Sequence, residues 1–260
     1  YDVGGENYIG AIISDREESS DSSEAFNFTG YNRNYGIDGK FNFANNYYLT
    51  FQLTQNNTKE INDTNFYYNT LKYYHFDNDK YSALYDGESY NGTNAFISFN
   101  RNARGWSFYT EYFYQPSTIR RDNGFISRNN FQYFFMQQEY NFYPSNSFLR
   151  RIDPELNFEV QYDMNGKLME QYFELNVVND WTNGLWTAIG YTFVNNQLYD
   201  DIFHKNVNTW HLNLEANNLS KILTGGISYE GGNYIVKFEY PSYVAFGHNF
   251  SLYSTFKPFE

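Results

Sequence analysis

The feature that most constrains this chain is the ribbon Trp106–Gln115, in which the side chains fall into two alternating sets. A period of two puts successive side chains on opposite faces of a β-strand, and it does not fit a helix. Residues 95–100 alternate in the same way, and residues 102–105 join the two runs with a glycine at the end, so the sequence predicts a hairpin. The two sets are Trp106, Phe108, Thr110, Tyr112 and Tyr114 against Ser107, Tyr109, Glu111, Phe113 and Gln115.

The same pattern continues along the chain and predicts about thirteen strands. Aromatic residues make up 22% of the sequence, and no window has the apolar stripe of an amphipathic helix, so an all-β fold is expected. No linker or shift in composition divides the chain, which favours a single domain over residues 1–260. The predicted strands are Asn7–Ser14, Tyr31–Phe43, Tyr47–Gln55, Thr93–Arg101, Trp106–Gln115, Asn130–Tyr143, Ile152–Tyr162, Leu168–Val178, Leu185–Val194, Asn208–Ala216, Lys221–Glu230, Asn233–Tyr240 and His248–Phe256.

The predicted connections alternate between long and short. The exception is 163–167, which is short where a long connection is due. Tight turns on one rim and long loops on the other are typical of an antiparallel up-and-down transmembrane β-barrel. The sequence therefore predicts such a barrel, or a large segment of one. The long connections are 15–30, 55–92, 116–129 and 195–207, and the short ones are 44–46, 102–105, 144–148 and 179–184.

Hydropathy is compatible with this prediction. No run of eighteen apolar residues occurs, and mean hydropathy is −0.70, but a barrel exposes only every second side chain of a strand to lipid. Tyr, Trp and Phe gather near strand ends, which predicts aromatic girdles at the lipid interfaces, although aromatic residues also fill strands well in general. An odd strand number does not close a bacterial barrel, so we expect a portion of a larger barrel.

The charge pattern bears on partners. Net charge is −12 with scattered Lys and Arg, which argues against nucleic acid, and the chain has no cysteine for a disulfide or thiolate metal site. Carboxylates on the polar sets of the strands would make a lumen attractive to cations. The predicted lumen-facing residues are Glu111, Glu155, Glu159, Glu170, Glu174 and Glu215, together with His211.

Three arginines in or next to the long connection after Gln115 are candidates for a constriction. Arg120, Arg121 and Arg128 bracket an apolar stretch, and an inward fold would pair them with lumen carboxylates and narrow a pore. The alternative is a solvated outer loop.

Other candidates for chemistry are weaker. Asp77, Asp79 and Glu88 occupy the first, third and twelfth positions of a calcium loop, but Ser82 stands where that loop needs glycine, so a solvated acidic loop is the preferred interpretation. Asp200 and Asp201 could be a hydrolytic carboxylate pair, yet neighbouring residues usually point apart, which favours a charged loop tip. The four histidines form no metal or catalytic pattern. We expect neither a cofactor nor catalysis in these residues.

Several segments resemble the C-terminal region of the DUF5916 family of Bacteroidota outer-membrane proteins. They are residues 8–16, 32–39, 122–128 and 148–152, the last followed by the Asn165-Gly166 turn. The resemblance implies a large transmembrane barrel that follows a periplasmic carbohydrate-binding module of family 9. This sequence would then be a middle portion of the barrel without that module, so any sugar binding implied by the family lies elsewhere.

The resulting expectation is a bacterial outer-membrane barrel that acts as a passive pore or membrane scaffold. Its partners would be the lipid bilayer with its lipopolysaccharide, and other outer-membrane or periplasmic proteins. Two alternatives remain open. One is a carbohydrate-binding or glycoside-hydrolase-associated outer-membrane protein, and the other is a structural subunit of a cell-envelope complex.

Overall fold

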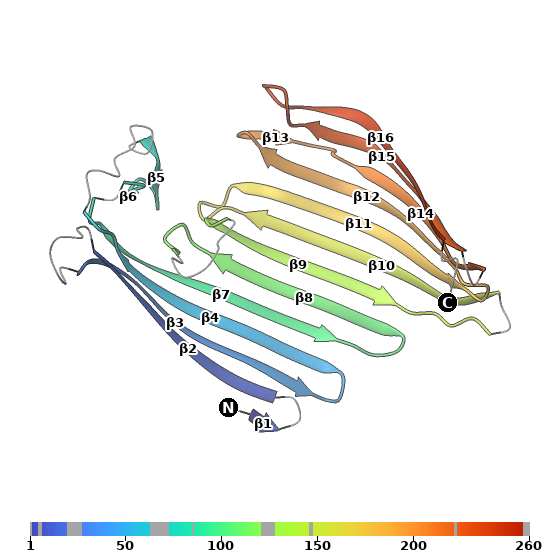
Figure 1. Ribbon diagram of the computed structural model, residues 1–260, viewed down its shortest axis with the longest axis horizontal. Helices are drawn as coiled ribbons and strands as arrows, with labels where there is room; N and C mark the ends of the chain where they lie inside the picture. The colour runs from blue at the N-terminus through green and yellow to red at the C-terminus, as the bar shows by residue number, and fades with distance from the viewer. Residues whose placement is uncertain are drawn as a thin grey trace. The chain divides into compact units, whose positions relative to one another are not determined.

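The computed structural model describes residues 2–4, 7–19, 28–62, 73–84, 86–120, 128–145, 148–220 and 223–256 (Figure 1). Every named element within them is a strand, so the all-β prediction is confirmed. In this part of the chain, no helix has the length and apolar character needed to cross a membrane. The strands are β1 (Asp2–Gly4), β2 (Asn7–Ser19), β3 (Phe28–Phe43), β4 (Tyr47–Lys59), β5 (His75–Phe76), β6 (Tyr81–Ser82), β7 (Ser89–Arg101), β8 (Trp106–Gln115), β9 (Phe131–Tyr140), β10 (Leu149–Tyr162), β11 (Leu168–Trp181), β12 (Leu185–Tyr199), β13 (Ile202–His204), β14 (Thr209–Ser220), β15 (Leu223–Val236) and β16 (Tyr243–Phe256).

The strands form a large antiparallel sheet in which chain neighbours are sheet neighbours. Its path runs β1-β2-β3-β4-β7-β8-β9-β10-β11-β12-β14-β15-β16, with β13 paired to β12, while β5 and β6 form a separate hairpin. Among the described residues, no ladder joins the two end strands β1 and β16. The up-and-down order is therefore observed, whereas closure into a barrel stays a prediction.

The alternation of connection lengths is confirmed in part, since residues 20–27, expected to be a long connection, and residues 141–148, expected to be a short one, each number eight. Residues 44–46, 102–105 and 182–184 join their strands on one side, while the connections after β4 and β8 are much longer and the former contains the β5–β6 hairpin. The predicted exception also holds, since residues 163–167 join β10 to β11 directly. There Asp163 Oδ1 accepts hydrogen bonds from the backbone amides of Asn165 and Lys167, which closes the tight turn.

The predicted division of residues 221–240 into two strands is wrong. Residues 223–236 form the single strand β15, which continues through Gly231 and Gly232, and β16 begins at Tyr243. Gly232 has a φ of 144°, which only glycine adopts easily, so the pair that resembles a turn is accommodated within a strand. Within the described residues, twelve strands have ten or more residues, and with the three-residue β1 the sheet path has thirteen strands, the number that the sequence predicted although it divides the chain differently.

The chain divides into two units. Unit 1 comprises Tyr1–Phe99, Glu111–Tyr133 and Tyr162–Lys167, and unit 2 comprises Asn100–Thr110, Phe134–Gln161 and Leu168–Glu260.

In unit 1, the register of β2, β3 and β4 separates apolar from polar side chains. Ile37 pairs with Ala11 and Leu53 on one face, whereas Asn34 pairs with Ser14 and Asn56 on the other. At the end of the apolar face next to turn 44–46, the rings of Phe43, Tyr47 and Phe99 stack with centroids 5.9 to 6.0 Å apart.

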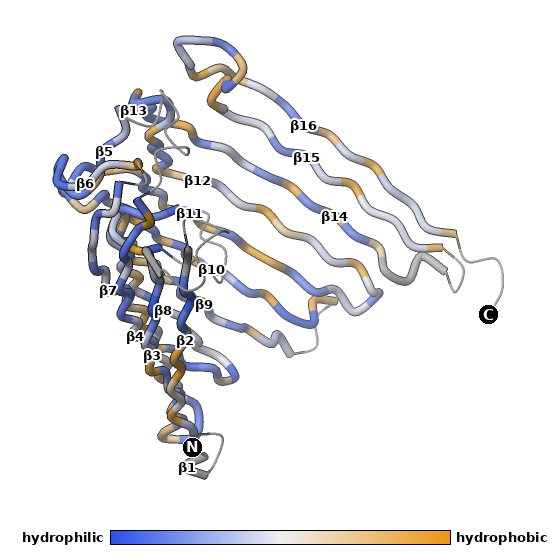
Figure 2. The backbone as a smooth tube through the Cα atoms, turned by 60° about the vertical axis from the view of Figure 1, so that its left-hand side comes forward, coloured by the Kyte–Doolittle hydropathy of each residue, from blue (hydrophilic) through white to orange (hydrophobic). Residues whose placement is uncertain are grey.

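The strands of unit 2 sort their side chains in the same way. Ile189 pairs with Val177 and Leu212 on the apolar face, and the next row is Gly190 with Asn176 and His211 on the polar face. Hydrophobic and hydrophilic residues alternate visibly along β14, β15 and β16 (Figure 2).

Burial is inverted relative to a water-soluble domain. Among the described residues, sixteen polar or charged residues are buried, against five hydrophobic ones. Asn32 and Asn56 are fully buried, whereas Ile13, Ile189 and Leu252 are 75%, 56% and 70% exposed. The apolar faces of both units therefore lie open, and the polar faces carry the buried groups.

Candidate functional site

A network of buried amides and hydroxyls covers the polar face of β3 and β4. Asn32 Nδ2 donates a hydrogen bond to Thr58 Oγ1 at 2.9 Å. Asn34 Nδ2 donates to Asn32 Oδ1, and Asn56 Nδ2 donates to Asn34 Oδ1, both at 2.8 Å. Thr58 Oγ1 donates in turn to Asn56 Oδ1 at 2.9 Å. A buried amide that finds partners stabilises the fold, so this face is ordered although it lacks apolar side chains.

Residues Pro116–Arg120, called the crossing segment below, lie over this polar face. The backbone oxygen of Arg120 accepts a hydrogen bond from Asn32 Nδ2 at 3.1 Å, and its backbone nitrogen donates to Asn56 Oδ1 at 3.3 Å. Ile119 and Thr118 are buried. The segment follows β8, yet its hydrogen bonds reach β4 and β3, which lie beyond β7 in the strand order. It therefore runs across the face rather than away from it.

Gly92 on β7 makes room for the crossing segment. A Cβ atom there would lie 2.9 Å from the backbone carbonyl carbon and oxygen of Thr118. Backbone atoms cannot move aside as a flexible side chain can, so the position requires glycine for close approach.

An ion pair between the buried Glu60 and the partly exposed Arg120 holds the end of the crossing segment. Arg120 Nη1 lies 3.2 Å from Glu60 Oε1, which also accepts a hydrogen bond from Tyr90 Oη at 3.0 Å. Burial raises the pKa of Glu60 to about 7, although the hydrogen bond from Tyr90 and the charge of Arg120 act to lower it. Glu60 follows directly after β4, so the ion pair joins the β4–β7 connection to the segment after β8.

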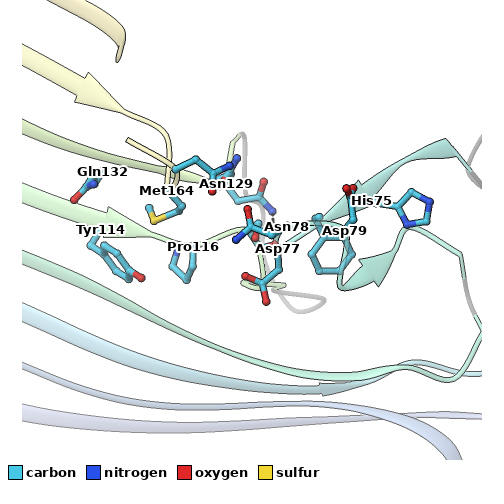
Figure 3. Close-up of a pocket in the computed structure, with 13 residues that line it drawn as sticks. His75, Asp77, Asn78, Asp79, Tyr114, Pro116, Asn129, Gln132 and Met164 are labelled. Carbon is cyan, nitrogen blue, oxygen red and sulfur yellow. Dashed lines mark hydrogen bonds between the residues drawn. The ribbon is translucent and has the colours of Figure 1, made fainter. Parts of the chain in front are cut away.

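A polar pocket of about 720 Å³ lies beside the crossing segment (Figure 3). The β5–β6 turn lines it with Asp77, Asn78 and Asp79, while β8 and the residues after it contribute Tyr114 and Pro116. A neighbouring cavity of about 360 Å³ touches Glu60, Tyr90 and Arg120 and shares His75, Phe76, Ser117 and Asn129 with the first. Together these cavities offer amides, carboxylates and the rings of Tyr74, Phe76, Tyr90 and Tyr114 to a polar solute.

The three predicted constriction arginines have different positions. Arg120 belongs to the crossing segment, and the carboxylate that it contacts is Glu60, which the sequence analysis did not single out. The guanidinium of Arg128 lies over the Phe131 ring, 5.8 Å from its centroid, and its backbone oxygen accepts a hydrogen bond from Gln115. Arg121 lies outside the described residues.

All of the predicted lumen-facing residues lie on the polar face of their own unit. In unit 1, Glu111 accepts a hydrogen bond from Tyr133. In unit 2, Glu174 Oε1 lies 4.0 Å from His211 Nδ1, and Glu215 shares the polar face of β14 with His211. Glu155 and Glu159 alternate along β10 with exposed Leu156, and Glu170 and Glu174 are near Tyr172 on β11. Whether these faces line a lumen remains a prediction.

The three acidic residues at calcium-loop spacing, for which a solvated acidic loop was the preferred interpretation, do not form one group. Asp77 and Asp79 have positive φ angles in the exposed β5–β6 turn. Among the described residues, the acidic group whose oxygens lie within 4.8 Å of one another combines Glu88 with Glu60 and Asp86 and contains neither turn aspartate. Asp200 and Asp201 also have positive φ angles, in the exposed turn between β12 and β13.

Sequence reasoning missed Glu60, Asp86 and the amide network of Asn32 and Asn56. Asn32 and Asn34 share one face of the predicted strand Tyr31–Phe43, but no local pattern indicates that a segment 88 positions along the chain covers them. A signal for Glu60 existed in its position near the start of the predicted long connection 55–92, where its negative charge makes it a candidate partner for the arginines of the next long connection, 116–129.

Comparison with models of known protein families and with curated proteins finds no match. The resemblance to the DUF5916 family therefore remains a prediction.

Proposed function

We propose that this chain is a transmembrane β-barrel, or a large segment of one, in a bacterial outer membrane. It would act as a passive pore or membrane scaffold whose interior is narrowed by the crossing segment. The inverted burial carries the proposal. Exposed apolar side chains lie on all of the long strands except β11, and most fully buried groups are polar, which is the arrangement that lipid outside and a polar interior demand.

The dimensions of the apolar face support a membrane location. On β3 it extends from Tyr35 to Phe43, roughly 20 to 26 Å depending on strand tilt, close to the apolar band of outer-membrane barrels. At the long-connection end of the same face, Arg33 pairs with Asp15 and Glu17 at 3.2 and 2.7 Å. Charges at that level suit a head-group region and would be costly at the centre of a bilayer.

The number of long strands, counted without the three-residue β1, also supports the proposal. Twelve long antiparallel strands give an even number, so the first long strand, β2, and the last, β16, run in opposite directions along the sheet path. An even number is what a single-chain bacterial barrel requires for antiparallel closure.

The test is to express the full chain with an export signal and to measure its membrane fractionation, its migration on a gel with and without heating, and its ion conductance. We expect it to fractionate with outer membranes, to run as a heat-modifiable band on a gel, and to conduct ions with cation preference in planar bilayers. A chain that folds and stays in solution without detergent would contradict the membrane location. A folded membrane protein without conductance would favour the scaffold over the pore.

The pocket beside the crossing segment favours one alternative, the retention of a polar solute such as an oligosaccharide. Amide and carboxylate groups line it together with the rings of Tyr114 and Phe76, a combination that suits sugar hydroxyls and ring faces. Saturable binding of neutral oligosaccharides that is lost on Asp79→Ala together with Asn129→Ala would support this alternative, and absence of binding to the folded wild type would exclude it for the sugars tested.

A further inference from the structure

Three carboxylates from two facing segments converge at the base of the β4–β7 connection. The backbone nitrogen of Glu60 donates a hydrogen bond to the backbone oxygen of Glu88 at 2.9 Å, and Asn62 forms an antiparallel β-bridge with Asp86. Glu60 and Glu88 thus lie opposite each other, and oxygens of Glu60, Asp86 and Glu88 all lie within 4.8 Å of one another. Like charges placed directly opposite repel, so something must offset this arrangement.

Two of the carboxylate oxygens are buried without a donor. Glu60 is 5% exposed, and within the described part of the chain neither its Oε2 atom nor Asp86 Oδ1 receives a hydrogen bond. The other oxygens of these groups have partners. Glu60 Oε1 faces Arg120 and Tyr90, and Asp86 Oδ2 accepts from Ser82 Oγ at 3.1 Å. A buried carboxylate oxygen without a partner carries a large desolvation cost, so these two atoms point to a ligand.

We propose that Glu60, Asp86 and Glu88 bind a divalent cation, of which Ca²⁺ is the best match. Three carboxylates and the Arg120 guanidinium leave two negative charges, which one such ion neutralises. Ca²⁺ takes oxygen ligands at about 2.3 to 2.6 Å and tolerates irregular geometry, so oxygens on either side of it lie up to about 5 Å apart, whereas Mg²⁺ demands a tighter octahedron.

The ion would link three parts of unit 1, namely the end of β4, the residues before β7 with the β5–β6 hairpin, and the crossing segment. Glu60 continues from β4, Asp86 and Glu88 lead into β7, and Ser82 of β6 donates its backbone nitrogen to Glu88 Oε2 at 2.8 Å. Through Arg120, the same cluster contacts the crossing segment. Bound Ca²⁺ would thereby order the β5–β6 hairpin and the pocket that its turn lines.

Terbium luminescence tests the site, because Tyr90 lies 3.0 Å from the Glu60 carboxylate and can sensitise a bound lanthanide. The full chain is refolded in detergent free of lipopolysaccharide, which itself binds cations, and titrated with Tb³⁺ and then with Ca²⁺. We expect a saturable Tb³⁺ signal that Ca²⁺ displaces, with a Ca²⁺ dissociation constant of about 10⁻⁴ to 10⁻³ M.

Asp86→Asn combined with Glu88→Gln should weaken Tb³⁺ binding about tenfold or more. Asp77→Asn combined with Asp79→Asn, in the exposed turn nearby, should leave it unchanged. Far-UV circular dichroism verifies folding, and Glu88→Gln alone is titrated if the paired variant does not fold. Three outcomes would each overturn the proposal. They are the absence of a saturable Tb³⁺ signal in the folded wild type, an unchanged signal in the folded Asp86/Glu88 or Glu88 variant, and loss of the signal in the Asp77/Asp79 variant. The first outcome would favour a proton shared between the carboxylates in place of an ion.

Discussion

Asn32 Nδ2 donates a hydrogen bond to the backbone oxygen of Arg120 at 3.1 Å across 88 positions of sequence. Both polar groups of the Arg120 backbone are satisfied by side chains of the polar face, since its nitrogen donates to Asn56 Oδ1. The crossing segment is therefore held by the same amides that order the face beneath it, and its position depends on a few fully buried residues.

Replacing Asn32 with alanine should release the crossing segment. The change removes the hydrogen bonds from Asn32 to Thr58 Oγ1 and to the backbone oxygen of Arg120, at a cost of about 1 to 3 kcal/mol. We expect larger single-channel conductance and faster proteolysis within residues 116–120. Asn57→Ala is the matched control, because Asn57 lies on the opposite face of β4. Unchanged conductance in a folded, conducting Asn32 variant would show that the segment does not limit the pore.

Gly92→Val should displace the crossing segment by a different route. A Cβ at Gly92 meets the Thr118 backbone at 2.9 Å, so the segment must shift rather than adapt through a side chain. We expect conductance to rise as in the Asn32 variant, while Asn91→Val on the opposite face of β7 leaves it unchanged. Identical conductance of the Gly92 and Asn91 variants would mean that the segment keeps its place.

How much of this fold could be predicted from the sequence depends on the distance over which each signal acts. Alternation within Trp106–Gln115 or 156–162 depends on neighbouring residues, and there the predicted faces agree with the observed burial. Gly231-Gly232 misled the prediction because the same dipeptide suits a turn or a strand, and only the ladder with β14 and β16 decides between them.

The candidate site was less predictable because its residues come from separate connections. Arg120 was singled out from its charge and loop, but its partner Glu60 lies on the other side of β7 in the strand order. The spacing of Asp77, Asp79 and Glu88 followed a local calcium motif, whereas the observed carboxylate cluster arises from pairing of 60–62 with 86–88. No local pattern encodes that pairing.

Trp106 should report on the lipid interface. Its ring is 44% exposed beside the short connection 102–105, and its Nε1 donates to Gln138 at 2.9 Å, so it presents an apolar body with a polar end satisfied. With the three other tryptophans replaced by phenylalanine, we expect quenching by lipids brominated near the head groups to exceed quenching by deeply brominated lipids. Quenching by iodide alone, with no effect of any brominated lipid, would place the ring in water.

Neighbouring residues on β14 provide the sharpest test of the inverted burial. Leu212 is 42% exposed between Ile189 and Tyr229 on the apolar face, and Asn213 follows it on the polar face. If the apolar face meets lipid near mid-bilayer, Leu212→Arg should destabilise the folded protein by about 2 to 4 kcal/mol. Asn213→Arg should cost far less, because Glu215 on the same face offers a nearby negative charge.

The same pair of variants separates the membrane proposal from a water-soluble sheet. In water, an arginine at a position as exposed as Leu212 would change stability by about 0.5 kcal/mol or less, because it stays hydrated. The measurement is denaturant unfolding in liposomes, followed by the heat-modifiable band. Equal stability of the two variants, or greater loss for Asn213→Arg, would contradict the assignment of the apolar face to lipid, and with it the barrel.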